Sequence, residues 1–105
     1  MLDVANIDKV GQNLRSFSLD FLTRPQCGLC DAAASIISRV AAIARAGIRI
    51  RDVTQDPALF DEYEHRIPVV LGPGERVLAE GRVDFWALLA AVLKARARWA
   101  VGSRR

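Results

Sequence analysis

The segment 16–46 constrains the fold most, because the spacing of its apolar residues changes abruptly at a pair of cysteines. In "SFSLDFL", bulky apolar residues alternate with Ser and Asp, which predicts a half-buried strand. Pro25 ends this strand, and from about Leu29 to Ala46 apolar residues recur at steps of three and four, which predicts an amphipathic helix. The fold therefore begins with a strand that leads directly into a helix through "TRPQCGLC".

The predicted helix has one apolar stripe and suitable residues at both ends. Asp31 lies in the first turn, where an acidic side chain suits the helix dipole, and Gly47 is the expected C-terminal stop. The stripe consists of Cys30, Ala33, Ile37, Val40 and Ala44. In the "GIRIRDV" that follows, Ile and Arg alternate, which predicts a second strand near the edge of a sheet.

The second half of the chain predicts a short helix, a hairpin and a final helix. Asp56 can cap a helix over "PALFDEYE" that begins at Pro57. The strands "IPVVL" and "RVLAEG" are joined by "GPGE", where Gly72 and Gly74 are expected to supply unusual backbone dihedrals. Asp84 can cap the last helix. The apolar positions of that helix include Phe85, Leu88, Leu89, Val92 and Leu93.

The order strand, helix, strand, short helix, strand, strand, helix predicts an α/β fold. Parallel pairing of the first two strands and an antiparallel hairpin give a mixed four-stranded sheet flanked by helices. A chain of 105 residues is long enough for one core. We assign residues 1–15 to an N-terminal arm, 16–98 to the domain and 99–105 to a basic C-terminal tail.

The ends of the chain bear on its location and partners. "MLDVANIDKV" has acidic residues where a secretory signal has basic ones, and the apolar run 85–93 is too short to span a bilayer, so we expect a cytoplasmic protein. Of the bases behind the net charge of +3, five follow Leu93 with no acid among them. Bases there offset the dipole of the last helix, and contact with nucleic acid or membrane is the alternative. With no basic stripe elsewhere, we expect neither partner.

The two cysteines allow three interpretations, of which we favour a redox pair. Cys27 lies at the start of a helix, where free amides and the helix dipole lower the pKa of a thiol, and Arg24 adds positive charge. Cys30, on the apolar stripe, is placed to resolve a mixed disulfide formed by Cys27. A zinc site needs four ligands, whereas the chain offers two cysteines and one histidine, His65. Two inert buried cysteines are the third interpretation.

In "RIPVV", Pro68 stands at the start of an apolar strand, where its missing amide matters most. Both a cis bond and an ordinary strand-initiating trans proline fit this position.

Three further residues have weaker signals. We expect His65 to be a solvated surface residue rather than a proton carrier, and Trp86 and Trp99 to serve in packing, with partner contact as the alternative for Trp99.

Taken together, "TRPQCGLC", "RIPVV" with Pro68 thirty-eight residues beyond Cys30, and "GRVD" before the last helix resemble the thioredoxin superfamily. The likeness covers roughly residues 16–95 and is closest to the glutaredoxin-like group of small bacterial proteins with a "TRPxCxLC" opening. The resemblance implies a cis Pro68 lying against the cysteine pair, with Cys27 as nucleophile and Cys30 as resolving thiol. It also implies that the Ile67 backbone pairs with an extended substrate chain, and that Arg24 contacts a glutathione carboxylate.

The sequence departs from the resemblance at two places. Gly28 and Leu29 separate the cysteines, in place of Gly-Pro or Pro-Tyr, and the double glycine of glutaredoxins is reduced to Gly81. These residues join Arg24, Ile67 and Pro68 as the expected substrate-binding set. Asp20, seven residues before the first cysteine, is out of register with the buried acid of thioredoxins.

The function we predict is thiol–disulfide oxidoreduction by the Cys27–Cys30 dithiol. The expected substrates are a protein disulfide or a glutathione mixed disulfide, with electrons from glutathione or a reductase, no tightly bound cofactor or metal, and a monomeric protein. The alternative is a binding module, which would hold a partner strand or bind an iron–sulfur cluster through Cys27 at a dimer interface.

Overall fold

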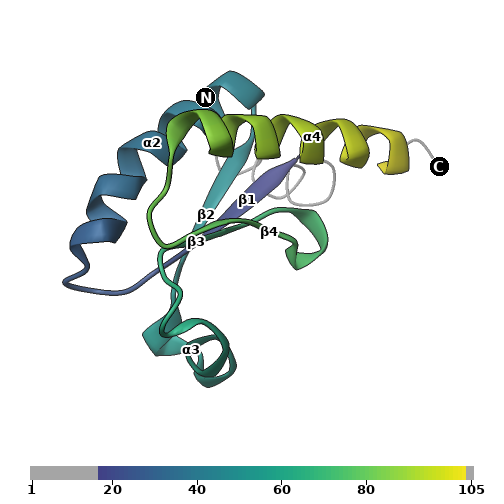
Figure 1. Cartoon of the computed structure of the whole chain (residues 1–105). Coiled ribbons are helices and arrows are strands. Elements are labelled where there is room, and N and C mark those ends of the chain that lie inside the picture. Colours follow the sequence, from purple (N-terminus) through teal and green to yellow (C-terminus); the bar gives the residue numbers. More distant parts are fainter. Residues whose placement is uncertain (1–16, 104–105) are drawn as a thin grey trace, which may run out of the picture.

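The chain alternates strands and helices in the predicted order. The computed structural model describes residues 17–103, so the predicted arm, residues 1–15, lies outside the described residues (Figure 1). The elements are β1 (Ser18–Thr23), α2 (Gly28–Ala44), β2 (Gly47–Asp52), η1 (Val53–Gln55), α3 (Pro57–Tyr63), β3 (Val69–Leu71), η2 (Pro73–Glu75), β4 (Val77–Glu80) and α4 (Phe85–Ser103). This confirms the α/β class.

The four strands form one mixed sheet in the order β2-β1-β3-β4. β1 pairs with β2 in parallel and with β3 antiparallel, and β3 pairs antiparallel with β4. The predicted mixed four-stranded sheet is therefore confirmed. Because β1 is an inner strand, the loop that leaves its C-terminal end starts from the middle of the sheet.

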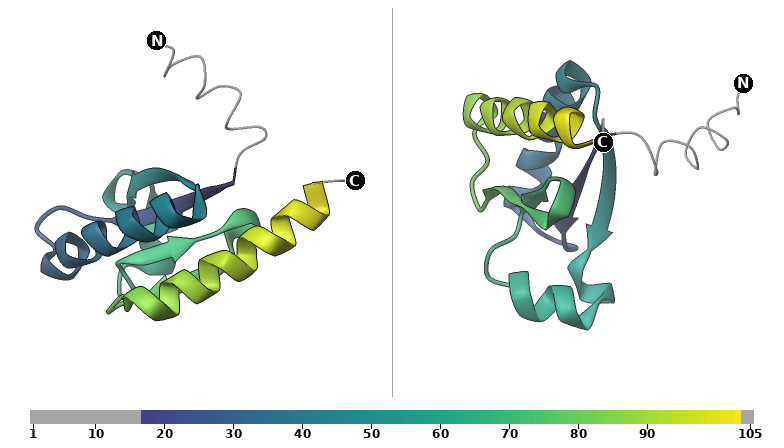
Figure 2. Two further views of the ribbon diagram at one scale, coloured as in Figure 1. Left: turned by 90° about the horizontal axis from the view of Figure 1, so that it is seen from above. Right: turned by 90° about the vertical axis from the view of Figure 1, so that its right-hand side faces the viewer.

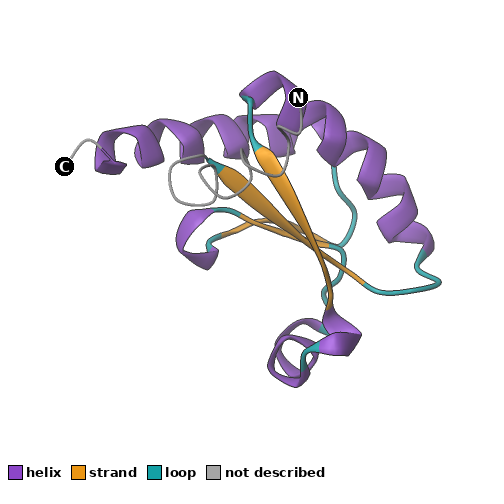
Figure 3. Ribbon diagram, turned by 180° about the vertical axis from the view of Figure 1, so that it is seen from behind, coloured by secondary structure: helices purple, strands orange, loops and turns teal. Residues whose placement is uncertain are grey.

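Helices cover both faces of the sheet. α2 and α4 pack together on one face and α3 lies on the other (Figures 1 and 2), and the view from behind shows the twisted strands between them (Figure 3). The core on the side of α2 and α4 includes Phe17, Leu19, Phe21, Ile37, Val40, Leu88 and Val92. The core on the side of α3 consists of Leu22, Val53, Tyr63, Ile67, Val69 and Leu71. Leu19 and Phe21 of β1 thus face the first core, as the alternation predicts, whereas Leu22 on the opposite face enters the second core, which the alternation did not predict.

α2 buries the predicted stripe, but its end differs from the prediction. All five predicted stripe residues are buried, together with Ala41. The helix ends at Arg45, which adopts the left-handed conformation with a φ of 56°, whereas Gly47 is already the first residue of β2. Glycine is favoured at such a position but not required, so Gly47 was a misleading signal.

β2 lies at a sheet edge, as predicted, yet its alternation does not reflect burial. Ile48 and Ile50 are both exposed, the latter 68% exposed. On the other face of the strand, Arg49 and Arg51 form ion pairs with Asp20 of β1 at 2.9 and 3.2 Å. The hydrogen bond to Asp20 raises the pKa of Arg49. β2 is therefore held by pairing with β1 and by these charges rather than by burial.

The hairpin between β3 and β4 uses one of the two expected glycines as predicted. Gly74 has a φ of 73°, whereas Gly72 is extended with a φ of −96°, and Glu75 has the second positive φ, 59°. Gly72 instead meets a close neighbour, since a Cβ there would lie 3.0 Å from Leu78 Cδ1. Gly72 serves a close approach rather than an unusual dihedral.

α4 begins at its predicted cap and continues beyond the predicted domain boundary. Asp84 accepts a hydrogen bond of 2.8 Å from the Ala87 amide, and the helix runs to Ser103, so residues 99–103 of the assigned tail are helical. Leu88 and Val92 are buried as predicted, but Leu93 is exposed. No helix within residues 17–103 is long and apolar enough to cross a membrane.

Candidate active site

The two cysteines lie where β1 gives way to α2. β1 ends at Thr23, the chain turns at Pro25 and Gln26, and Cys27 is the N-cap of α2. Gln26 has a φ of 58°, in the left-handed region that residues other than glycine rarely adopt. This turn sets the direction in which Cys27 enters the helix.

Cys27 and Cys30 are joined in a disulfide, with their Cα atoms 5.2 Å apart. The Cys30 amide also donates a hydrogen bond of 3.1 Å to the Cys27 sulfur. This sulfur therefore takes the place of the side-chain oxygen that caps most helices. Cys27 is 9% exposed and Cys30 is 3% exposed, so the cysteine at the helix start is the more accessible one, as predicted.

The surface around the disulfide is open, and the helix end favours negative charge at Cys27. Gly28 has no heavy atom within 4 Å of the position that a Cβ would take, and Leu29 is 44% exposed. Arg24 is exposed, and so is Asp31, whose amide donates to the Cys27 carbonyl at 3.1 Å. Because Cys27 stands at the positive end of a 17-residue helix, negative charge on its sulfur is stabilised.

The strand that follows the cis proline begins beside the same end of β1. Ile67–Pro68 is a cis peptide bond, as the resemblance implies, and both residues are buried. Val69 pairs with Leu22, so the register brings Pro68 to the end of the sheet from which the chain leaves toward the cysteines. The Ile67 amide donates to the Tyr63 carbonyl at 3.2 Å. An extended peptide placed beside Ile67 would therefore pair with the Ile67 carbonyl rather than with the Ile67 amide.

Gly81 ties this proline loop to the start of the last helix. Its amide donates to the Pro68 carbonyl at 2.8 Å and to the Arg66 carbonyl at 3.1 Å. Its φ of 72° is one that glycine adopts without steric cost. Gly81 and Pro68, both proposed from the sequence, are thus brought into direct contact.

Arg66 is a residue of this region that sequence reasoning missed. Its guanidinium donates to Glu80 at 2.7 and 3.1 Å and to Glu62 at 3.3 Å, and it lies 4.8 Å from the centre of the Tyr63 ring. The hydrogen bond to Glu80 raises the pKa of Arg66. The four-residue spacing of Glu62 and Arg66 in "EYEHR" is the signal that could have found it. Arg66 fixes the segment that leads into the proline.

The remaining candidates lie away from the disulfide chemistry. The His65 side chain is 89% exposed and lies 3.8 Å from Glu64, so its assignment as a solvated residue is confirmed. Trp86 touches the Phe85 ring but is 73% exposed, so its prediction as a packing residue is wrong in the main. Within residues 17–103, no three His, Cys, Asp or Glu side chains gather in a group that could hold a metal ion.

A cysteine pair at the start of a helix, beside a strand that begins after a cis proline, defines a thioredoxin-like fold with a dithiol–disulfide site. The family model described as "Glutaredoxin-like domain (DUF836)" matches residues 18–97. The chain therefore belongs to this glutaredoxin-like family of the thioredoxin superfamily.

Solved structures agree with this fold. The X-ray structure of the structural genomics target XcR50 from X. campestris is 34% identical, with a TM-score of 0.56 over 70% of this chain and 92% of that one. Protein Ne2328 from Nitrosomonas europaea, solved by NMR, is 17% identical, with a TM-score of 0.62 over 70% of this chain and 88% of the other.

Thioredoxin 1 from Thermosipho africanus is 18% identical, with a TM-score of 0.52 over 84% of this chain and 99% of that one. This match shows the fold alone. The comparison with curated proteins found no match.

Proposed function

We propose that the protein is a thiol–disulfide oxidoreductase that reduces protein disulfides or glutathione mixed disulfides. The observation that carries the proposal is the Cys27–Cys30 disulfide at the start of α2, in which the helix cap is the more exposed cysteine. Membership of the glutaredoxin-like family supports it. The disulfide form is then the oxidised product of one catalytic cycle.

The cycle begins with the reduced protein. The Cys27 thiolate attacks one sulfur of the substrate disulfide, that bond breaks, and the departing thiolate takes up a proton. The Cys30 thiol then loses its proton and attacks the Cys27 sulfur. The second substrate thiol leaves, and the Cys27–Cys30 disulfide forms. Two electrons pass from the protein to the substrate, and two thiols of glutathione or a dithiol reductase return them.

The roles of the two cysteines follow from their surroundings. In the disulfide form the Cys30 amide donates to the Cys27 sulfur, which stands at the positive end of α2. A Cys27 thiolate at the same position would be stabilised by both, so we expect its pKa to lie below the ordinary value of about 8.5. Cys30 lies within the first turn of α2 and is almost fully buried, and burial favours the neutral thiol over the thiolate. The first attack therefore belongs to Cys27 and the second to Cys30.

Alkylation against pH tests these roles. The rate of reaction with iodoacetamide is measured in reduced Cys30→Ser, which leaves Cys27, and in reduced Cys27→Ser, which leaves Cys30. We expect Cys27 to titrate below the ordinary value of about 8.5 and Cys30 not to do so. Cys30→Ser should also accumulate a mixed disulfide with a disulfide substrate. The proposal fails if Cys27 titrates as a free cysteine and Cys27→Ser keeps its reductase activity.

The electron donor we propose is glutathione, with Arg24 as the contact for one of its carboxylates. Arg24 is exposed, three residues before Cys27, in the turn that leads into α2. Arg24→Gln should raise the KM for glutathione about three- to tenfold and leave kcat within twofold, because an exposed charge pair contributes binding but no chemistry. Arg45→Gln, at the other end of α2, is the matched control. Equal effects of the two variants, or activity with a thioredoxin reductase alone, would count against glutathione.

A further inference from the structure

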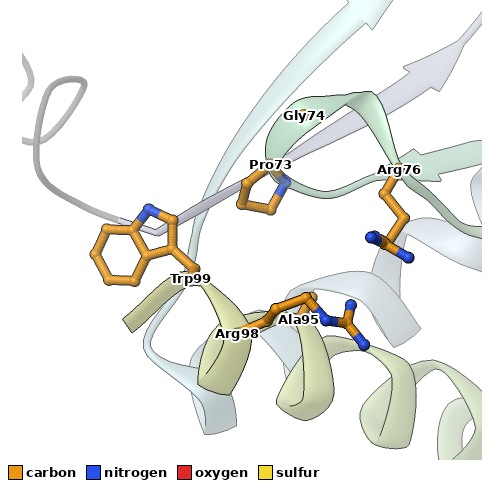
Figure 4. A pocket seen from close by; sticks show the side chains of 6 residues that line it. All are labelled: Pro73, Gly74, Arg76, Ala95, Arg98 and Trp99. Carbon is orange, nitrogen blue, oxygen red and sulfur yellow. The ribbon is translucent and has the colours of Figure 1, made fainter. Parts of the chain in front are cut away.

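A second candidate site lies at the end of the sheet opposite the cysteines. It is a pocket of about 270 Å³ between η2 and the second half of α4 (Figure 4). It is lined by Pro73, Gly74, Arg76, Ala95, Arg98 and Trp99. The cysteines follow the last residue of β1, whereas the hairpin turn follows Leu71, which pairs with Asp20 near the start of β1. The pocket is thus separated from the disulfide by about the length of a six-residue strand, roughly 20 Å.

One part of the pocket is apolar. Pro73 from the turn and Ala95 from the helix lie on opposite sides of it, and Trp99 lies at one end (Figure 4). The Trp99 ring is fixed by an edge-on contact with Phe17, at 5.7 Å between ring centres. A rigid aromatic wall of this kind binds flat apolar groups with little loss of conformational freedom.

The other part of the pocket is basic. The guanidinium groups of Arg76 and Arg98 lie on the same side and point toward one another (Figure 4). Within residues 17–103 neither forms an ion pair, and Glu75, next to Arg76 in the chain, pairs with neither. Arg96 is different, because it lies over the Phe17 ring at 5.5 Å and over the Trp99 ring. Two guanidinium groups on one side of a pocket, with no ion-pair partner in the described part of the chain, attract an anion.

We propose that this pocket binds a small organic anion with a flat apolar body. The body lies against Trp99, Pro73 and Ala95, and a carboxylate or phosphate is held between Arg76 and Arg98. The planar fork of arginine matches the oxygens of either group, and the volume leaves room for on the order of ten non-hydrogen atoms. The site does not use the cysteines, so it is independent of the proposed redox function.

Titration of the full-length oxidised protein with four probes tests the proposal. Phenyl phosphate and phenylacetate carry both a ring and an anion, 2-phenylethanol carries the ring alone, and inorganic phosphate carries the anion alone. Trp99 fluorescence is the readout in a Trp86→Phe background, since Trp86 lies in the first turn of α4, away from the pocket. We expect dissociation constants below about 1 mM for the ring-bearing anions and binding at least about tenfold weaker for the other two.

Matched variants assign the binding to the pocket. Arg76→Gln and Arg98→Gln should each weaken binding about tenfold, because each removes one fork of the anion site. Lys94→Gln removes the same charge from an exposed position of α4 that does not line the pocket, and should change affinity less than twofold. Tighter binding of both ring-bearing anions than of the other two probes supports the proposal. Whichever of phenylacetate and phenyl phosphate binds more tightly identifies the preferred anionic group.

Three results would overturn the proposal. If 2-phenylethanol or inorganic phosphate bound as tightly as the ring-bearing anions, the pocket would not recognise the ring and the anion together. An equal loss in Lys94→Gln would mean that only the net charge of α4 matters. No saturation by either ring-bearing anion at about 10 mM would mean that the pocket does not bind this class.

Discussion

The two ends of α2 have a similar backbone and different capping atoms. A residue other than glycine adopts the left-handed conformation on each side of the helix, Gln26 with a φ of 58° and Arg45 with a φ of 56°. At the C-terminal end the capping is by backbone alone, because the Ala46 amide donates to the Ala41 carbonyl at 2.8 Å. At the N-terminal end the acceptor is a sulfur, that of Cys27.

Because of this difference, the C-terminal end of α2 bears on stability and the N-terminal end bears on the proposed chemistry. The C-terminal cap only satisfies backbone hydrogen-bonding groups. The left-handed conformation of Arg45 therefore lowers stability and does not contribute to the chemistry. At the N-terminal end the capping atom is the proposed nucleophile, and the strained residue before it directs that atom. Changes at the N-terminal end should therefore alter activity, and changes at the C-terminal end should alter stability.

The largest effect expected is on turnover. Cys27→Ser should lower disulfide reductase activity by about a thousandfold or more, because the hydroxyl keeps a capping oxygen but cannot replace the thiolate. Arg45→Ser introduces the same residue at the other end of the helix and should leave activity within twofold. Insulin reduction and glutathione-mixed-disulfide reduction, assayed side by side, measure both. Comparable losses in the two variants would remove the distinction between the ends.

The second effect concerns packing along α2. Ile37 is almost fully buried in the main core, whereas Leu29, between the cysteines, is 44% exposed. Ile37→Ala should lower the free energy of unfolding by about 2–5 kcal/mol, and Leu29→Ala by less than about 0.5 kcal/mol. Urea unfolding of the oxidised proteins gives both values. A cost at Leu29 equal to that at Ile37 would show that the active-site end is packed as tightly as the core.

Much of this arrangement could be predicted from local residue patterns. The alternation of β1, the stripe of α2 and the caps Asp56 and Asp84 identified the elements, because each depends on residues within a few positions of one another. The motif "TRPQCGLC" with the later Pro68 identified the fold and the position of the cysteines. These are the parts of the molecule in which local sequence and global fold agree.

The rest depends on which segments the fold brings together. Ile48 and Ile50 alternate as the apolar residues of β1 do, and the sequence placed their strand near an edge, but the pattern itself does not reveal that both side chains stay exposed there. Gly47 and Gly72 looked like turn residues, whereas the path of the chain placed positive φ values at Arg45 and Glu75 instead. The basic pocket joins η2 to α4, and no spacing within either segment signals the other.

The third prediction tests the strained residue at the active-site end. Gln26→Gly should lower kcat about three- to tenfold, because glycine allows the turn other conformations and Cys27 is held less firmly in its attacking position. The free energy of unfolding should rise by no more than about 1 kcal/mol, as for the same change at Arg45, because relief of strain slightly outweighs the added chain entropy. Gln26→Asn is the matched control, because asparagine tolerates the left-handed conformation, and it should keep activity within twofold. Full activity in Gln26→Gly would mean that this turn does not direct the cysteine.

The smallest effect expected is at the C-terminal end of α2. Arg45→Gly should raise the free energy of unfolding by about 0.5–1 kcal/mol, because glycine adopts the left-handed conformation without the steric cost that a Cβ imposes. Activity should stay within twofold, since no atom of the active site changes. Arg45→Ala removes the same side chain but keeps the Cβ, so it should show no such gain. If the two variants are equally stable in urea unfolding, the left-handed conformation costs nothing at this end, and the contrast with Gln26 rests on activity alone.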